Sequence, residues 1–267
     1  MSADLAMQVC INILLAWSVQ ATMAAGALSF ASAAFMAVGC YGSSVLTVWY
    51  GWPLVPAMVA GAAMAALMSV PVGLMTLGLR GAYFILATIG VTISTQVVLE
   101  NVGALGGSAG FGGMMGAELG HALSAVAVVG AVLLLLSRTA LQRVLDAVRE
   151  DRAVAASLGV PVVAVRVAAF AAGAAIAGYA GGLYAHTLMF VRPESFGIQV
   201  GISATFFAIL GGTATPFGPL LGAVVLTLLP EYVTALADWR PTVYGVAIIL
   251  ILRLRPRGLL PMRWRTA

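Results

Sequence analysis

The feature that most constrains this chain is a stretch from Leu5 to Leu79 that contains no charged residue. A helix rises about 1.5 Å per residue, so about 20 apolar residues cross the roughly 30 Å hydrocarbon core of a bilayer. The whole chain is 62% hydrophobic and only 8% charged, whereas soluble domains are about 45–50% apolar and about 25% charged. A soluble fold could not hide so much apolar surface behind so few charges. The sequence therefore predicts an integral membrane protein.

Turn signals divide the chain into candidate spans, and the continuous apolar runs favour helices over the alternating strands of a barrel. Breaks fall at Gly26 and at residues 51–53, where Trp49 and Tyr50 join Trp52 in an aromatic cluster typical of a membrane interface. The expected spans lie near residues 8–26, 29–49, 53–78, 81–99, 118–137, 166–188, 198–212, 216–235 and 241–253. The predicted fold class is all-α, a polytopic transmembrane helix bundle of about eight or nine spans.

The arginines predict how the bundle is oriented. Five of them fall between Arg138 and Arg166, and five fall between Arg253 and Arg265. The positive-inside rule places both segments in the cytoplasm, and the even number of expected spans between them agrees with that placement. The loop from about 100 to 117 and the N-terminus are then external. The N-terminus lacks the basic region of a signal peptide, so its first span is kept as part of the mature protein.

The absence of lysine excludes several chemistries from this chain. All thirteen basic residues are arginine, so neither a Walker A loop nor a lysine Schiff base can form. ATP-driven work would need a nucleotide site on another subunit. The net charge of +4 comes from the two arginine clusters and indicates topology rather than nucleic-acid binding. Cys10 and Cys40 are expected to be small buried hydrophobes, and His121 and His186 form no metal-site spacing, so no metal or cofactor is expected.

Ionisable residues avoid the middle of the expected spans. Secondary transporters and pumps usually carry such residues at membrane depth. Here both histidines and most acids lie near span ends, the acids being Glu100, Glu118, Glu194, Glu231 and Asp238. Proton or sodium coupling is therefore disfavoured. Unwound backbone carbonyls can also bind sodium, so an ion-coupled secondary transporter or channel for a small solute is the alternative function.

Residues 106–110 match the G-x-S-x-G pattern of a hydrolase nucleophile elbow. That motif works only on a strand-to-helix turn with a positioned histidine and acid. Here it lies in a glycine-rich loop, residues 103–116, of an all-helical chain. A flexible or docking loop is favoured over an intramembrane hydrolase that would use Ser108 with His121 or His186, and the chain is not expected to be an enzyme.

Small residues recur every four positions in the span 166–188, with a second row beside the first. The two rows are Ala169, Gly173, Ala177 and Gly181, and Ala174, Gly178 and Gly182. Such faces let helix backbones approach closely in lipid. Bundle packing is the favoured interpretation, and the lining of a narrow permeation path stays open beside it.

The expected cytoplasmic loop, residues 138–166, contains an amphipathic pattern. From Leu141 to Leu158 the apolar residues follow helical spacing, and Gly159 followed by Pro161 ends the helix. Such a helix could lie in the lipid interface or dock into a groove of a soluble partner. Its charges are mixed in sign, which favours the partner. Gly159 is expected to be left-handed.

Four segments of the sequence resemble a known family. Residues 150–159 read EDRAVAASLG and resemble the cytoplasmic "EAA" coupling loop of ABC-importer permeases. The longer run over residues 145–186 is similar to the branched-chain amino acid permeases of the LivM/LivH type, as are residues 26–41, 79–111 and 209–231. The stretch 79–111 favours the LivM side.

The resemblance implies one transmembrane permease domain over residues 1–267, with a coupling loop at 138–166, in a bacterial inner membrane. It implies a second permease subunit, two cytoplasmic ABC ATPases and a periplasmic binding protein as partners, besides the lipid bilayer. The cargo would be a branched-chain or other hydrophobic amino acid or a related amide. The coupling helix would present Arg149, Glu150, Ala155, Ala156 and Gly159 to the ATPase. The resemblance identifies no pathway residues.

Overall fold

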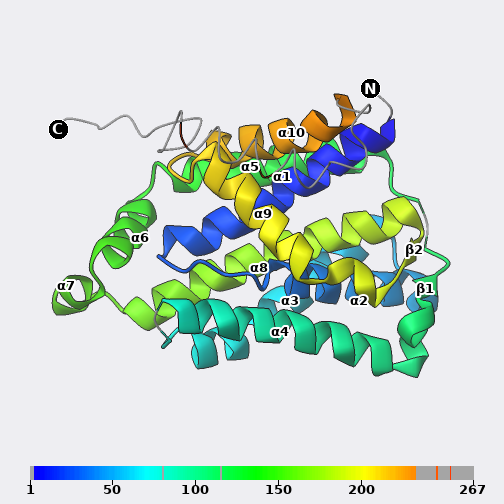
Figure 1. Ribbon diagram of the computed structural model, residues 1–267, viewed down its shortest axis with the longest axis horizontal. Helices are drawn as coiled ribbons and strands as arrows, with labels where there is room; N and C mark the ends of the chain where they lie inside the picture. Colours follow the sequence, from blue (N-terminus) through cyan, green and yellow to red (C-terminus); the bar gives the residue numbers. More distant parts are fainter. Residues whose placement is uncertain (1–2, 80, 115, 233–244, 246–252, 254–267) are drawn as a thin grey trace.

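The computed structural model describes residues 3–79, 81–114 and 116–232, together with Gly245 and Arg253, and it is a helical bundle (Figure 1). The long helices are α1 (Ala3–Ala24), α2 (Ser32–Tyr50), α3 (Leu54–Thr76), α4 (Ala82–Asn101), α5 (Leu119–Leu136) and α8 (Val162–Leu188). The shorter ones are α6 (Ala140–Glu150), α7 (Arg152–Ser157), α9 (Ile198–Gly211) and α10 (Phe217–Tyr232). Three 3-10 turns join them: η1 (Gly103–Leu105), η2 (Gly107–Ala109) and η3 (Pro193–Phe196).

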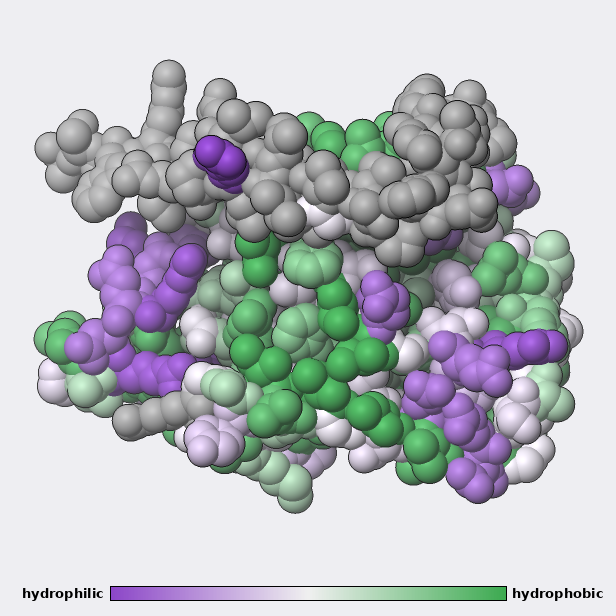
Figure 2. Space-filling view, viewed as in Figure 1, coloured by the Kyte–Doolittle hydropathy of each residue, from purple (hydrophilic) through white to green (hydrophobic). Residues whose placement is uncertain are grey.

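The predicted fold class is confirmed. Within the described residues, seven helical segments are long and apolar enough to cross a membrane, the last of them being η3 continued by α9. Helix α10 is apolar but only 16 residues long. The expected span 241–253 and the arginine-rich tail lie outside the described residues, apart from Arg253. Figure 2 shows hydrophobic residues across the middle of the bundle and hydrophilic residues gathered toward both ends, as a membrane belt requires.

Helix α8 lies at the centre and has its most extensive contacts with α3, α2 and α1. Its small residues make these contacts possible. A Cβ at Gly173 would lie 2.7 Å from the Ser18 carbonyl oxygen of α1, and one at Gly178 would lie 2.6 Å from Ala65 Cβ of α3. A Cβ at Gly181 would collide with the Met36 carbonyl of α2. The small-residue rows therefore serve bundle packing, as favoured from the sequence.

Residues 25–31 connect α1 to α2 without helical structure and run back between neighbouring helices (Figure 1). A non-helical backbone at this depth needs protein partners, because lipid offers none. Helix α4 supplies them: the Phe30 N–H donates to Thr88 Oγ1 at 3.2 Å, and Thr92 Oγ1 donates to the Phe30 carbonyl at 3.1 Å. The span expected at 29–49 therefore begins only at Ser32.

The two ends of the bundle carry different structures. Helices α6 and α7 project from one end, and a short antiparallel ribbon lies at the other (Figure 1). In that ribbon, β1 (Phe111–Gly112) pairs with β2 (Phe190–Val191), with Phe111 opposite Val191. The segment expected in the cytoplasm and the loop expected outside thus lie at opposite ends. The aromatic cluster Trp49, Tyr50 and Trp52 is exposed at the ribbon end.

Candidate functional site

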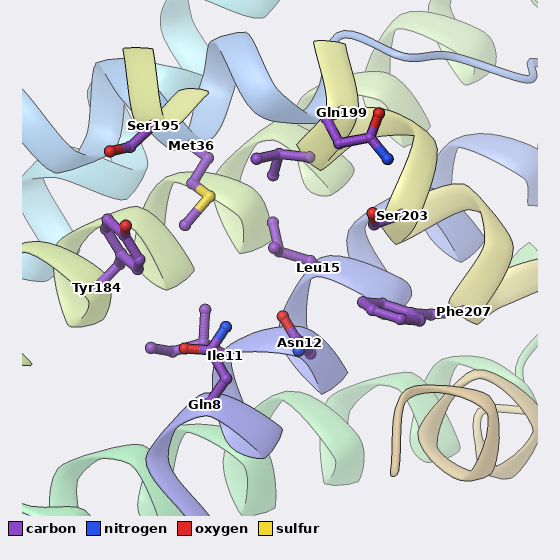
Figure 3. A pocket seen from close by; sticks show the side chains of 11 residues that line it. Gln8, Ile11, Asn12, Leu15, Met36, Tyr184, Ser195, Gln199, Ser203 and Phe207 are labelled. Atoms are coloured by element: carbon purple, nitrogen blue, oxygen red, sulfur yellow. The ribbon is translucent and has the colours of Figure 1, made fainter. Parts of the chain in front are cut away.

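A cavity of about 290 Å³ lies among α1, α2, α8, η3 and α9 (Figure 3). Six of its lining residues carry uncharged polar groups: Gln8, Asn12, Tyr184, Ser195, Gln199 and Ser203. The remaining wall is apolar and is made by Ile11, Leu15, Met36, Val200 and Phe207. No charged side chain is among these lining residues. The cavity is therefore polar without being ionic.

Helical periodicity brings the polar groups together. On α1, Gln8 and Asn12 are four residues apart and lie on one face. On α9, Gln199 and Ser203 repeat the same spacing, and Figure 3 shows both pairs around the shared cavity. Sequence reasoning looked for charges at mid-span and so missed these residues. The signal was present as neutral polar residues at four-residue spacing within apolar helices.

Contacts behind the cavity hold its wall in place. Asn12 Nδ2 donates to Thr227 Oγ1 of α10 at 2.9 Å, which ties α1 to the last described helix. The rings of Tyr184 and Phe196 meet edge to face with centroids 5.7 Å apart, and Phe196 meets Tyr41 of α2 in the same way at 6.2 Å. Such aromatic pairs stabilise a fixed geometry beyond their buried area. The cavity is thus part of the packed bundle.

Amides and hydroxyls both donate and accept hydrogen bonds, so the lining can replace water around a small polar solute. It offers no fixed charge that would hold an ion tightly. A surface of this kind suits passage of a hydrated or zwitterionic solute rather than catalysis on it. The apolar wall, which includes Leu15, Met36 and Phe207, can contact a hydrocarbon side chain.

The expected coupling helix is two helices. The sequence predicted one helix from Leu141 to Leu158, but α6 ends at Glu150 and α7 begins at Arg152. Between them Asp151 is extended, and its Oδ1 accepts the backbone N–H groups of Ala153 at 2.8 Å and Val154 at 3.1 Å. Aspartate competes in this way with the helical backbone and caps the following helix instead.

The five residues assigned to coupling occupy different positions on this pair of helices. Arg149 and Glu150 are exposed at the end of α6, and Ala156 is exposed on α7. Ala155 is buried, with 1% of its surface exposed. Gly159 has φ = +82°, as predicted, and a Cβ there would meet no atom within 4 Å. The structure brings Arg149 and Glu150 together but separates them from Gly159 by the whole of α7.

The Gly26 turn is one place where this segment contacts the bundle. A Cβ at Gly26, just beyond α1, would lie 3.4 Å from Arg149 Cα. Arg152 also reaches this turn, because its Nη2 lies 3.4 Å from the Gly26 carbonyl oxygen. Helix α6 therefore touches the bundle where α1 ends and the non-helical segment begins.

The hydrolase interpretation finds no supporting geometry. Ser108 is exposed on the 3-10 turn η2 rather than on a strand-to-helix elbow. His186 is fully buried, with Nδ1 2.7 Å from the Gly182 carbonyl and Nε2 3.1 Å from Thr47 Oγ1. Both of its ring nitrogens are therefore engaged inside the bundle. Within the described ranges, no group of three or more potential ligands could hold a metal ion.

Comparison with known families decides the kind of protein. Residues 1–252 match the family described as "Branched-chain amino acid transport system / permease component". The chain belongs to this permease family. The family consists of transport components of ABC systems and not of enzymes, so the function class predicted from the sequence is confirmed.

Two relatives of the permease agree with the LivM side of the resemblance. Both are named "High-affinity branched-chain amino acid transport system permease protein LivM". The one from Salmonella typhimurium LT2 is 30% identical over 302 residues, which cover 98% of this permease and 70% of the relative. The one from Escherichia coli K12 is 30% identical over 276 residues, which cover 89% of this permease and 64% of the relative. No solved structure matches the chain.

Proposed function

We propose that this permease is the membrane-spanning subunit of an ATP-driven importer for branched-chain or other hydrophobic amino acids or related amides. The observation that carries the proposal is the uncharged polar cavity between α1 and α9 in a chain of this family. Its amides and hydroxyls suit the ends of a zwitterion or an amide, and its apolar wall suits a hydrocarbon side chain. Residues 1–267 form one permease domain.

The energy comes from partner subunits in this proposal. The chain has no lysine for a phosphate loop, and the relatives are named as permease proteins of a transport system. The expected assembly contains a second permease subunit, two cytoplasmic ABC ATPases and a periplasmic binding protein. Nucleic acid is not a partner.

Residues 138–166 form the coupling element, in which Arg149, Glu150, Ala155, Ala156 and Gly159 contact or support the contact with the ATPase. Its position supports this role. Helix α6 meets the bundle at Gly26, directly after α1, and the opposite half of α1 lines the polar cavity. A displacement of α6 on ATPase closure would therefore reach the cavity through one helix.

The orientation follows from the arginines. We place residues 138–166 and the C-terminal tail from Arg253 in the cytoplasm, since ten arginines lie in these two segments. Cysteines introduced at Arg143 and Arg263 should resist an impermeant thiol reagent added to intact cells and should react after lysis. The native Cys10 and Cys40 are buried and give a low background. Labelling of either introduced cysteine from outside would reverse the topology.

Reconstitution tests the function itself. Proteoliposomes that contain this chain alone should show no uptake of labelled leucine. Addition of the ATPases, the second permease, the binding protein and ATP should give uptake that survives an ionophore, because no ion gradient drives it. Robust gradient-driven uptake by the chain alone would instead establish the ion-coupled alternative.

A further inference from the structure

A second cavity, of about 390 Å³, lies at the other end of α1 beneath α6. Helices α1, α5, α6 and α8 bound it. Its lining is dominated by aliphatic side chains, with Leu133 and Leu136 from α5, Leu141 and Leu145 from α6, and Ala168 and Ala172 from α8. The small alanines of α8 leave the space that the leucines surround. This apolar cavity has no part in the proposed substrate path.

The cavity is a wedge that is closed at one end. Helix α5 packs tightly on α1 where a Cβ at Gly130 would lie 2.9 Å from the Trp17 indole. One turn further along α5, at Leu133, the cavity begins. Leu136 and Leu141 are 37% and 46% exposed, and Ala168 and Ala172 are exposed as well. The wedge therefore opens at the protein surface.

An apolar space of this size favours an apolar occupant. An empty cavity forfeits dispersion contacts along its whole lining, and water needs polar partners to enter. Two glutamines line the cavity; both direct their NH₂ groups to protein partners, which leaves Gln20 Oε1 as a single buried acceptor without a partner. Gln20 Nε2 lies 3.3 Å from the Thr213 carbonyl oxygen, and Gln142 Nε2 donates to Asp146 Oδ1 at 3.0 Å. In a bilayer the hydrocarbon that meets such an opening is a lipid acyl chain.

One arginine, Arg138, lies beside the opening of the cavity, in the loop between the lining residues Leu136 and Leu141. It is exposed, and it has no ion pair within the described ranges. Arg143 lies on the face of α6 that points away from the lining residues Leu141 and Leu145. Guanidinium groups at the end of a membrane span bind phosphate well, because they combine charge with paired donors. The mouth therefore complements a phospholipid headgroup, and the interior complements its tail.

We propose that this cavity binds an anionic phospholipid, with one acyl chain between α5 and α8 and the phosphate against Arg138. The lipid would lie directly under α6. Because Leu141 and Leu145 of α6 line the cavity, the bound lipid would contact the coupling helix directly. The lipid is thus a structural ligand of the coupling element.

Photolabelling in nanodiscs tests the site without ATP or any partner, so its failure is separable from failure of the importer proposal. The probe is phosphatidylglycerol with a photoreactive group on its acyl chain. Peptide mapping should place the adducts within residues 133–145 and 164–172. Ala168→Phe fills the cavity and should reduce labelling at these peptides by about fivefold or more. Ala63→Phe, the same change at an exposed alanine of α3, should leave it unchanged.

Competition tests the headgroup. Unlabelled phosphatidylglycerol should compete better than diacylglycerol, which lacks the phosphate. Arg138→Gln should lower that preference by about fivefold, whereas Arg143→Gln on the far face of α6 and Arg192→Gln at the opposite end should keep it. Equal competition by diacylglycerol would overturn the phosphate contact. Absence of adducts in the wild-type chain, or equal labelling of Ala168→Phe, would overturn the proposal.

Discussion

The two cavities of this permease share α1 and α8 but differ in both lining and construction. The polar cavity is set among helices whose backbones nearly touch, since a Cβ at Gly181 would collide with the Met36 carbonyl beside it. The apolar cavity lies where α5 and α6 have few contacts with the central helix. The same two helices therefore line a polar cavity at one end and an apolar cavity at the other, and no charged residue lines either.

The two linings need different surroundings. A polar space inside a membrane protein must be walled off from lipid, because lipid cannot satisfy its hydrogen-bonding groups. Close packing of α2 on α8 provides that wall on one side, whereas Gln8 and Gln199 are exposed on the other. An apolar space needs no such wall, since acyl chains and leucines are equivalent neighbours. Substitutions that add bulk should therefore destabilise the protein around the polar cavity and be tolerated around the apolar one.

Gly181→Val should have the largest effect of the substitutions considered, a loss of stability. The added side chain must push α2 away from α8, and overpacking of this kind costs about 1–3 kcal/mol or more. Ala168→Val, which adds similar bulk at the apolar cavity, should stay within about 0.5 kcal/mol of wild type. A thiol-reactive dye reports unfolding, because Cys10 and Cys40 are buried. Equal melting temperatures for the two variants would show that the polar cavity does not depend on close packing of α2 on α8.

Gln199→Leu should have the next largest effect, on transport rather than stability. It removes one amide from the polar cavity at nearly constant volume, and a lost hydrogen bond of about 1.4 kcal/mol lowers uptake about tenfold. The matched change in the apolar cavity, Gln142→Leu, removes only a helical side-chain pair with Asp146 and should alter uptake less than about twofold. Initial uptake rates in the reconstituted importer distinguish the two. A larger loss of uptake for Gln142→Leu would indicate that the solute uses the apolar cavity and not the polar one.

Gly159→Val should weaken coupling by a smaller amount. The left-handed conformation of Gly159 costs a residue with a Cβ about 1–2 kcal/mol, and no neighbour is displaced because the space around it is open. The control is Gly78→Val, at an open position without a positive φ. Co-purification of the ATPase should fall several-fold for Gly159→Val and for Glu150→Arg, whereas Gly78→Val should behave as wild type. Normal assembly and uptake for all three would mean that the segment rests on lipid.

Asp151→Ala should have the smallest and most local effect. It removes the cap of α7, at a cost of about 0.5–2 kcal/mol, while the bundle and both cavities are untouched. Hydrogen exchange should accelerate at residues 152–157 and remain slow in α8. Asp151→Asn keeps an accepting oxygen and should largely restore protection. Slow exchange in the alanine variant would show that the cap does not hold the helix.

Hydrophobic length predicted most of the fold, because the bilayer fixes how many apolar residues a span needs. The break between α6 and α7 was missed, since apolar spacing continues through Asp151 and only its side-chain hydrogen bonds stop the helix. The late start of α2 was missed for a related reason. Residues 25–31 contain no charged residue, and tertiary hydrogen bonds of Phe30 with Thr88 and Thr92 help to stabilise their non-helical path.

The candidate site was harder to predict than the fold. A charged residue in a span is conspicuous, whereas Gln8, Asn12, Gln199 and Ser203 are neutral and scattered over two distant segments. Their common meaning depends on α1 and α9 facing one another, which is a tertiary property. The coupling segment could be located from the sequence because its amphipathic pattern is local. Gly159 could be assigned its conformation because its position before Pro161 is a local signal too.

The glycine contacts also determine how the permease can move. Gly39, Gly61 and Gly178 bring α2, α3 and α8 together, and Gly211, Gly218 and Gly222 do the same for α9 and α10. Little side-chain volume lies between these backbones, so sliding within either group would disrupt close packing. Helix α1 contacts both groups: Gly173 of α8 packs against its Ser18 carbonyl, and its Asn12 and Trp17 donate hydrogen bonds to Thr227 and the Pro216 carbonyl. The polar cavity lies between α1 and α9, so its width would change if α9 and α10 moved together against the rest of the bundle.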